Sequence, residues 1–67
     1  MERYTYEITF THHDGKEEVQ QHTSEALARE FFQMFNEPDS AEMYSEIRLT
    51  EYDWETKTEK LLDILRF

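Results

Sequence analysis

The sequence predicts an α+β domain in which two β-hairpins flank one helix in the order ββαββ. Three observations support this prediction. Residues 4–11 alternate apolar and polar side chains, as a half-buried strand does, and residues 25–36 repeat apolar side chains with helical spacing. Residues 47–64 fold into a second hairpin whose facing side chains match. With no internal repeat and no linker rich in glycine or proline, we expect residues 1–67 to form a single domain.

The first predicted hairpin turns at Asp14-Gly15, a dipeptide typical of two-residue type I′ turns, in which both central residues take positive φ. Folding about this turn places Phe10 opposite Val19. This register leaves Val19 on the same face as the apolar side chains of the first strand. Those side chains are Tyr4, Tyr6, Ile8 and Phe10.

The predicted helix spans residues 25–36, where strand-forming side chains are few. Thr23 or Ser24 provides its N-cap, and Pro38 prevents its continuation. At the ~100° per residue of an α-helix, its apolar side chains cover one arc, which predicts that the helix packs on a sheet. These side chains are Leu27, Ala28, Phe31, Phe32, Met34 and Phe35.

Residues 54–57 form the predicted turn of the second hairpin, with Asp53 facing Thr58. The paired positions farther along match in charge or in apolar character. These further pairs are Glu51 with Lys60, Leu49 with Leu62, Arg48 with Asp63, and Ile47 with Ile64. Residues 58–67 also fit a short amphipathic helix, but the hairpin explains more of the pattern.

A right-handed crossover from the second strand places the third strand beside the first. The result is a four-stranded antiparallel sheet with the order 2-1-3-4 and the helix on one face. The predicted core is Tyr6, Ile8, Phe10, Val19, Leu27, Phe31, Phe35, Ile47, Leu49, Leu62 and Ile64.

The opposite face of the second hairpin stays uncovered in this arrangement. It collects Tyr44, Tyr52, Leu61, Leu65 and Phe67, with Trp54 in the turn. Contiguous exposed apolar surface of this kind predicts a partner site or an oligomer interface. The alternative is that the twist of the sheet tucks some of these side chains into a second small cluster.

The chain has 16 Asp and Glu residues against 7 Lys and Arg, for a formal net charge of −9. This charge repels nucleic acid and anionic membranes, so we expect direct binding to neither. The chain has no cysteine, signal-peptide pattern or apolar run of membrane-spanning length, which predicts a cytoplasmic protein.

Five acids follow one another from the linker after the helix to the second turn. Alternate side chains on a strand lie about 6.6 Å apart, comparable to the step between neighbouring phosphates. The five acids therefore predict a discontinuous row that imitates DNA, although such a run is also typical of a solvated face. They are Glu42, Glu46, Glu51, Asp53 and Glu55.

The sequence gives little support for catalysis. His12, His13 and His22 do not converge in the predicted fold, so we expect no metal site. A chain with one glycine has no glycine-rich phosphate loop, and we expect no cofactor. Glu7 faces His22 in the predicted register, but an open sheet neither excludes water nor positions a substrate. We interpret them as a polar pair in a protein that is not an enzyme.

Three segments carry a resemblance to a known family: the hairpin with Asp14-Gly15-Lys16, the helical run EFFQMF at residues 30–35, and the strand segment IRL at residues 47–49. Together they resemble the compact inhibitors of uracil-DNA glycosylase that phages encode. Members of that family are acidic DNA mimics built from an antiparallel sheet and a helix.

In that family, a pocket formed partly by the helix receives the apolar side chain that the glycosylase inserts into the DNA minor groove. Carboxylates engage the DNA-binding groove of the enzyme. The resemblance implies that Glu30, Phe31 and Phe35 lie near such a pocket. Phe32 stands where the family prefers an acid, and the second hairpin is additional to the family pattern.

We therefore expect a monomeric inhibitor that blocks the DNA-binding face of a basic nucleic-acid enzyme, with uracil-DNA glycosylase as the first candidate. If the chain is encoded by a phage, it acts in the cytoplasm of the bacterial host. The partner-binding residues are Glu30, Phe31, Phe35, Glu42, Tyr44, Glu46, Glu51, Tyr52, Asp53, Trp54 and Glu55. Two alternatives remain: an inhibitor of the anti-CRISPR type, and a small assembly module that uses the exposed aromatic face of the second hairpin.

Overall fold

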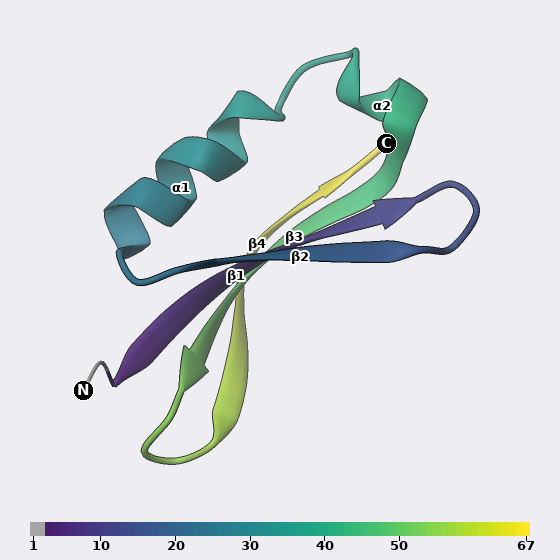
Figure 1. Cartoon of the computed structure of the whole chain (residues 1–67). Helices are drawn as coiled ribbons and strands as arrows, with labels where there is room; N and C mark the ends of the chain where they lie inside the picture. The colour runs from purple at the N-terminus through teal and green to yellow at the C-terminus, as the bar shows by residue number, and fades with distance from the viewer. Residues whose placement is uncertain (1–2) are drawn as a thin grey trace.

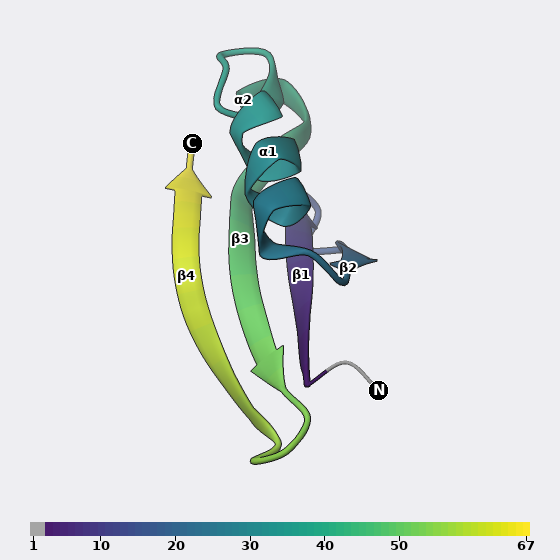
Figure 2. The same cartoon turned by 90° about the vertical axis from the view of Figure 1, so that its left-hand side faces the viewer.

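The computed structural model, which describes residues 3–67, has four antiparallel strands in the order β2-β1-β3-β4 and one main helix, as the sequence predicts (Figure 1). The elements are β1 (Tyr4–His12), β2 (Glu17–His22), α1 (Glu25–Met34), α2 (Ser40–Met43), β3 (Tyr44–Asp53) and β4 (Thr58–Arg66). Helix α1 lies over β1 and β3 (Figure 2). We call this side of the sheet the covered face and the other side the open face. The C-terminal segment is a strand, so its alternative assignment as a helix is wrong.

The core lies between α1 and the two central strands. Ile8 and Phe10 of β1 lie opposite Leu49 and Ile47 of β3, and all four side chains are buried. Phe32 of α1 is fully buried against this layer. The other members of the core cluster are Tyr6 and Ala28, with Tyr4, Phe35, Tyr44, Leu62 and Leu65 packed around it. The core of the described chain is therefore one apolar layer on one face of the sheet.

The sequence predicts the apolar arc of α1 but misplaces its centre. Leu27 and Phe31, both expected in the core, are 53% and 43% exposed, whereas Ala28 and Phe32 are fully buried. The small side chain of Ala28 allows the helix backbone to approach the sheet, so the line of contact runs through Ala28 and Phe32. Leu27, Phe31 and Met34 consequently form an exposed apolar flank along α1.

The first hairpin closes through a three-residue loop, and the predicted two-residue turn is wrong. The Gly15 amide donates to the His12 carbonyl at 3.0 Å, and the His12 amide donates to the Lys16 carbonyl at 2.8 Å. Gly15 has a φ of 92°, but Asp14 does not have positive φ, so the type I′ geometry is not formed. The register shifts by one residue, and Val19, expected in the core, turns to the open face.

The second hairpin begins in the predicted register and then departs from it. The pairs Asp53 with Thr58 and Glu51 with Lys60 are confirmed, as is the turn at residues 54–57. Beyond them, a β-bulge at Leu62 shifts the register, so that Ile47 lies opposite Leu65. Ile64, expected in the core, faces the open side. Leu62 and Leu65 both pack against the core. They are three residues apart, so in a regular strand they would point to opposite faces.

A second irregularity brings Tyr44 to the covered face. The β1–β3 register shifts at the end of β1, and Tyr44 lies opposite His12. Its ring centroid lies 5.1 Å from that of Phe10 and 6.3 Å from that of Phe35. Tyr44 and Leu65 were both expected on the uncovered aromatic face. Both placements are wrong because the irregularities reverse the alternation of side chains.

Helix α1 begins and ends close to the predicted positions. Of the two candidate caps, Ser24 is the N-cap, and its hydroxyl oxygen accepts a hydrogen bond from the Leu27 amide at 3.4 Å. The helix ends at Met34, before the chain reaches Pro38. The turn that follows leads into the single helical turn of α2, which enters β3 directly.

The unequal burial of two neighbouring phenylalanines predicts unequal effects of the same substitution. We expect Phe32→Ala to lower the free energy of unfolding by about 3–5 kcal/mol, because it opens a cavity against β1 and β3. Phe31→Ala is the matched control and should cost less than about 1 kcal/mol, since Phe31 already contacts solvent. Urea titrations followed by circular dichroism measure both. Equal losses in the two variants would contradict this position of α1.

Candidate protein-binding surfaces

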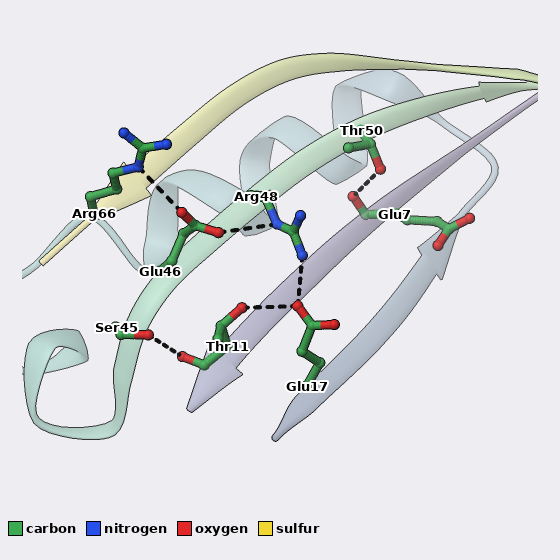
Figure 3. Close-up of polar contacts among 8 residues, drawn as sticks. All are labelled: Glu7, Thr11, Glu17, Ser45, Glu46, Arg48, Thr50 and Arg66. Atoms are coloured by element: carbon green, nitrogen blue, oxygen red, sulfur yellow. Dashed lines mark hydrogen bonds and ion pairs between the residues drawn. The ribbon is translucent and has the colours of Figure 1, made fainter. Parts of the chain in front are cut away.

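A network of ion pairs lies on the open face, at the end of the sheet where β1 and β4 end (Figure 3). Arg48 Nη2 lies 2.7 Å from Glu17 Oε2, and Arg48 Nε lies 3.2 Å from Glu46 Oε2. Arg66 Nε contacts the other oxygen of Glu46 at 3.2 Å. The Thr11 hydroxyl donates to Glu17 Oε2 at 3.2 Å. The network links β2, β3 and β4, and its two carboxylates are matched by two guanidinium groups.

A second charged cluster lies at the turn between β3 and β4. Arg3 donates from Nε and Nη2 to the two carboxylate oxygens of Asp53, at 3.3 and 3.1 Å, and its Nε lies 3.4 Å from Glu55 Oε2. Asp53 Oδ1 also accepts from the Glu55 amide at 2.9 Å and the Thr56 amide at 3.4 Å. The hydrogen bond from Arg3, aided by the two amides, lowers the pKa of Asp53 to about 2.

The five acids predicted to form a DNA-like row are not brought together. Glu46 points to the open face, whereas Glu51 and Asp53 lie on the covered face. Glu42 is in α2, and Glu55 is in the turn with Arg3. Side chains on a strand alternate between faces, so acids at both even and odd positions of β3 cannot share one row. Three of them, Glu46, Asp53 and Glu55, are already held in ion pairs.

Glu51 lies on the covered face of the sheet, at the border of the apolar core. It lies opposite Tyr6 of β1 and Lys60 of β4. Burial raises the pKa of Tyr6, and the carboxylate of Glu51 raises it further. Glu51 therefore belongs to the polar border of the core rather than to a surface aimed at a partner.

The exposed aromatic face predicted on the second hairpin is smaller than expected. Tyr52 and Trp54 pack edge to face with their ring centroids 4.7 Å apart, and Leu61 is 53% exposed on the open face. The Trp54 indole donates to the Thr5 hydroxyl at 3.1 Å, which holds the ring against β1. Phe67 is exposed at the C-terminal end of β4.

A further exposed apolar surface, missed at the sequence level, lies along α1. It consists of the flank Leu27, Phe31 and Met34, at helical spacings of four and three residues. The Phe31 ring lies 5.2 Å from the ring of His22, which places this flank on the β2 side of the helix. Met43 of α2 is also exposed, at 58%. The sequence does contain a signal for this surface, because the apolar arc of the helix is wider than the part of α1 that packs on the sheet.

The residues that the family resemblance places near a pocket lie in different environments. Phe35 packs 4.9 Å from Phe10 and is part of the apolar surroundings of the core. Glu30 and Phe31 are exposed on α1. Aromatic rings therefore occupy the space beneath Phe35, and the surface offered to a partner lies on the outer side of the helix.

Four exposed acids form what we call the acidic end of the molecule, from the last turns of α1 to α2 (Figure 1). They are Glu30, Glu37, Asp39 and Glu42. Within residues 3–67 none of them takes part in an ion pair. No Lys or Arg occurs between Arg29 and Arg48 in the sequence, and this is the signal that identifies the acidic end. His13 Nε2 lies 2.7 Å from the Ala41 carbonyl oxygen and ties the first hairpin to α2.

The histidines do not form a metal site. Each contacts a different part of the protein: His12 lies 3.1 Å from Glu18, His13 contacts Ala41, and His22 packs on Phe31. In the part of the chain that the structure describes, no three His, Asp or Glu side chains are placed to hold a metal ion. Glu7 lies opposite Gln21 on the open face, while His22 is on the covered face, so the predicted Glu7–His22 pair is not formed.

Comparison of the chain with known protein families, with curated proteins and with solved structures finds no match. Neither helix among residues 3–67 has the length and apolar character needed to cross a membrane. The surfaces described above are therefore the basis for a functional proposal.

The pKa of Asp53 predicts how acid affects the β3–β4 turn. Its folded pKa of about 2 lies below the ordinary 3.8, so the Asp53–Arg3 contact stabilises the fold above about pH 4 and is lost as the pH falls towards 2. We expect Arg3→Gln to raise the Asp53 midpoint towards 3.8 and to move acid unfolding to higher pH.

Carboxyl-carbon NMR titration measures this midpoint, and circular dichroism against pH follows unfolding. Arg29→Gln is the matched control, because it removes an arginine that pairs with Glu25 on α1, far along the chain from the turn. A wild-type Asp53 midpoint near 3.8 would disprove the role assigned to Arg3.

Proposed function

We propose that this protein is an acidic inhibitor that binds the DNA-binding face of a nucleic-acid enzyme, with uracil-DNA glycosylase as the first target to test. The observations that support the proposal are the acidic end, whose four exposed carboxylates take part in no ion pair within residues 3–67, and the exposed apolar flank of α1. Uracil-DNA glycosylase is the first target because the first hairpin, the helix and the following strand resemble phage inhibitors of that enzyme.

The acidic end fits a basic groove better than the open face does. An acid that already pairs with arginine presents little net charge to a partner, and the network of Glu17, Glu46, Arg48 and Arg66 sums to zero formal charge. The acidic end carries four formal negative charges with no base in its own segment. Such a surface attracts a phosphate-binding groove through the same long-range electrostatics that DNA uses.

The apolar flank supplies the part of the contact that does not depend on salt. Leu27, Phe31 and Met34 of α1 are exposed in the free protein, and so is Met43 of α2. Burying side chains of this size against a partner contributes roughly 25 cal/mol per Å² of apolar area. Flexible methionines adapt to the shape of the opposing surface. Charge then directs the encounter, and apolar burial prolongs the complex.

The proposed partner is a basic enzyme, and the protein itself binds no nucleic acid. Its net charge of −9 repels DNA and RNA. If the chain is encoded by a phage, the proposed site of action is the cytoplasm of the infected bacterium, where the target enzyme meets DNA.

A uracil-excision assay on uracil-containing DNA tests the target. We expect this protein in excess over uracil-DNA glycosylase to suppress excision, and added salt to weaken the suppression because the contact is electrostatic. Undiminished excision would remove this enzyme as the target. Inhibition of another DNA-binding enzyme, such as a CRISPR effector, would retain the class of function, and failure to bind either class of enzyme would reject it.

A pair of charge-removing variants locates the surface. We expect Glu37→Gln combined with Glu42→Gln to weaken inhibition by about tenfold, because both carboxylates belong to the acidic end. The matched control is Glu7→Gln combined with Glu18→Gln, which removes the same charge from β1 and β2 and should change inhibition by less than about threefold. Inhibition constants at two salt concentrations measure the difference. If both pairs of variants lost inhibition equally, the acidic end would not be the contact surface, and inhibition would depend on the net charge of the protein or on another surface.

A further inference from the structure

Strand β4 is an edge strand of the sheet. It pairs with β3 on one side, and in the described chain its other backbone edge has no strand beside it (Figure 2). Helix α1 lies over β1 and β3, so it does not cover this edge. Nine residues of exposed edge form a template for pairing with another chain unless the side chains oppose it.

The side chains of β4 on the open face form a self-complementary pattern. Their partners on β3 place them: Glu59 lies opposite Tyr52, Leu61 opposite Thr50, Ile64 opposite Arg48, and Arg66 opposite Glu46. Read along the strand, the open-face order is acid, apolar, apolar, base. Read in the reverse direction, as an antiparallel second copy presents it, the order is base, apolar, apolar, acid.

The bulge at Leu62 makes this pattern possible. Glu59 and Arg66 are an odd number of residues apart, so in a regular strand they would point to opposite faces. The extra residue in the middle returns both to the open face. A two-fold axis through the bulge then sets residues of the same face opposite each other along the whole segment 59–66. A register displaced by one residue from this one sets the open face of one copy against the covered face of the other.

We propose that β4 pairs antiparallel with β4 of a second copy of this chain, about a two-fold axis at Leu62 and Asp63, to form a homodimer with one continuous sheet. Glu59 of each copy faces Arg66 of the other, and Leu61 of each copy faces Ile64 of the other. The partner is a second copy because both the charges and the apolar side chains complement their own reverse order.

The groups involved are free to make these contacts. Within residues 3–67 Glu59 takes part in no ion pair, and the Arg66 side chain is 76% exposed while contacting Glu46. Leu61 is 53% exposed, and pairing would cover it. One feature opposes the dimer: the two copies of Asp63 lie diagonally across the axis on the covered face. The dimer is therefore weak and depends on protein concentration.

The other edge strand, β2, lacks this complementarity. It carries Glu17 and Glu18 with no Lys or Arg, so pairing two copies of β2 gathers negative charge. A β4 dimer also leaves α1 uncovered in both copies, because α1 lies over β1 and β3 and away from the β4 edge. The inference is thus independent of the proposed inhibitor function, although it departs from the monomer that the sequence favours.

Sedimentation of charge-reversal variants, alone and mixed, tests the proposal. We expect the wild-type protein to dimerise with rising concentration, and Glu59→Lys or Arg66→Glu to weaken dimerisation at least about tenfold, because each sets like charges opposite at both ends of the interface. An equimolar mixture of the two variants restores opposite charges at both ends, so it should dimerise like the wild type. Glu46 keeps Arg48 as a partner when Arg66 is replaced.

A second pair of variants keeps the test valid if a charge reversal disturbs folding. Leu61→Asp should abolish dimerisation, and Val19→Asp, at an equally exposed position on β2, should leave it unchanged. Circular dichroism confirms that each variant is folded. A wild-type chain that stays monomeric at millimolar concentration overturns the proposal. So does a mixture no more dimeric than its components, or equal losses from Leu61→Asp and Val19→Asp.

Discussion

The packing of α1 on the two central strands is the contact on which the rest of the structure depends. Phe32 and Ala28 meet Ile8, Leu49 and their neighbours in one thin apolar layer, and within residues 3–67 no second layer supports the sheet. Because the helix axis follows the small side chain of Ala28, three large apolar residues are displaced to its flank. The same packing that forms the core therefore creates the exposed surface on which the functional proposal rests.

Two departures from regular strand geometry decide what each face of the sheet presents. The shift at the end of β1 brings Tyr44 into the core, and the bulge at Leu62 brings in Leu65. Both irregularities add apolar side chains to a small core, and regular alternation would leave these side chains exposed. In return, the open face loses Tyr44 and Leu65, and on β4 it keeps the self-complementary set Glu59, Leu61, Ile64 and Arg66.

Two groups of acids in this chain have different physical roles. Glu17, Glu46 and Asp53 pair with arginines and tie strands and turns together, at half-exposed sites where each pair contributes little alone. Those at the acidic end have no base in their segment and keep their full charge for an encounter with another molecule. Net charge does not distinguish the two groups, but the position of the arginines does.

The sequence by itself determined the class of fold, the strand order, the start of the helix and the lack of bases between Arg29 and Arg48, because periodicity, capping and charge are local properties. It also identified five of the seven core residues, those on β1 and β3. Only the tertiary structure decided which part of the helical arc is buried, where registers shift and which acids find arginines. These depend on side-chain volumes and on contacts between distant segments, and a shift of one residue reverses every face beyond it.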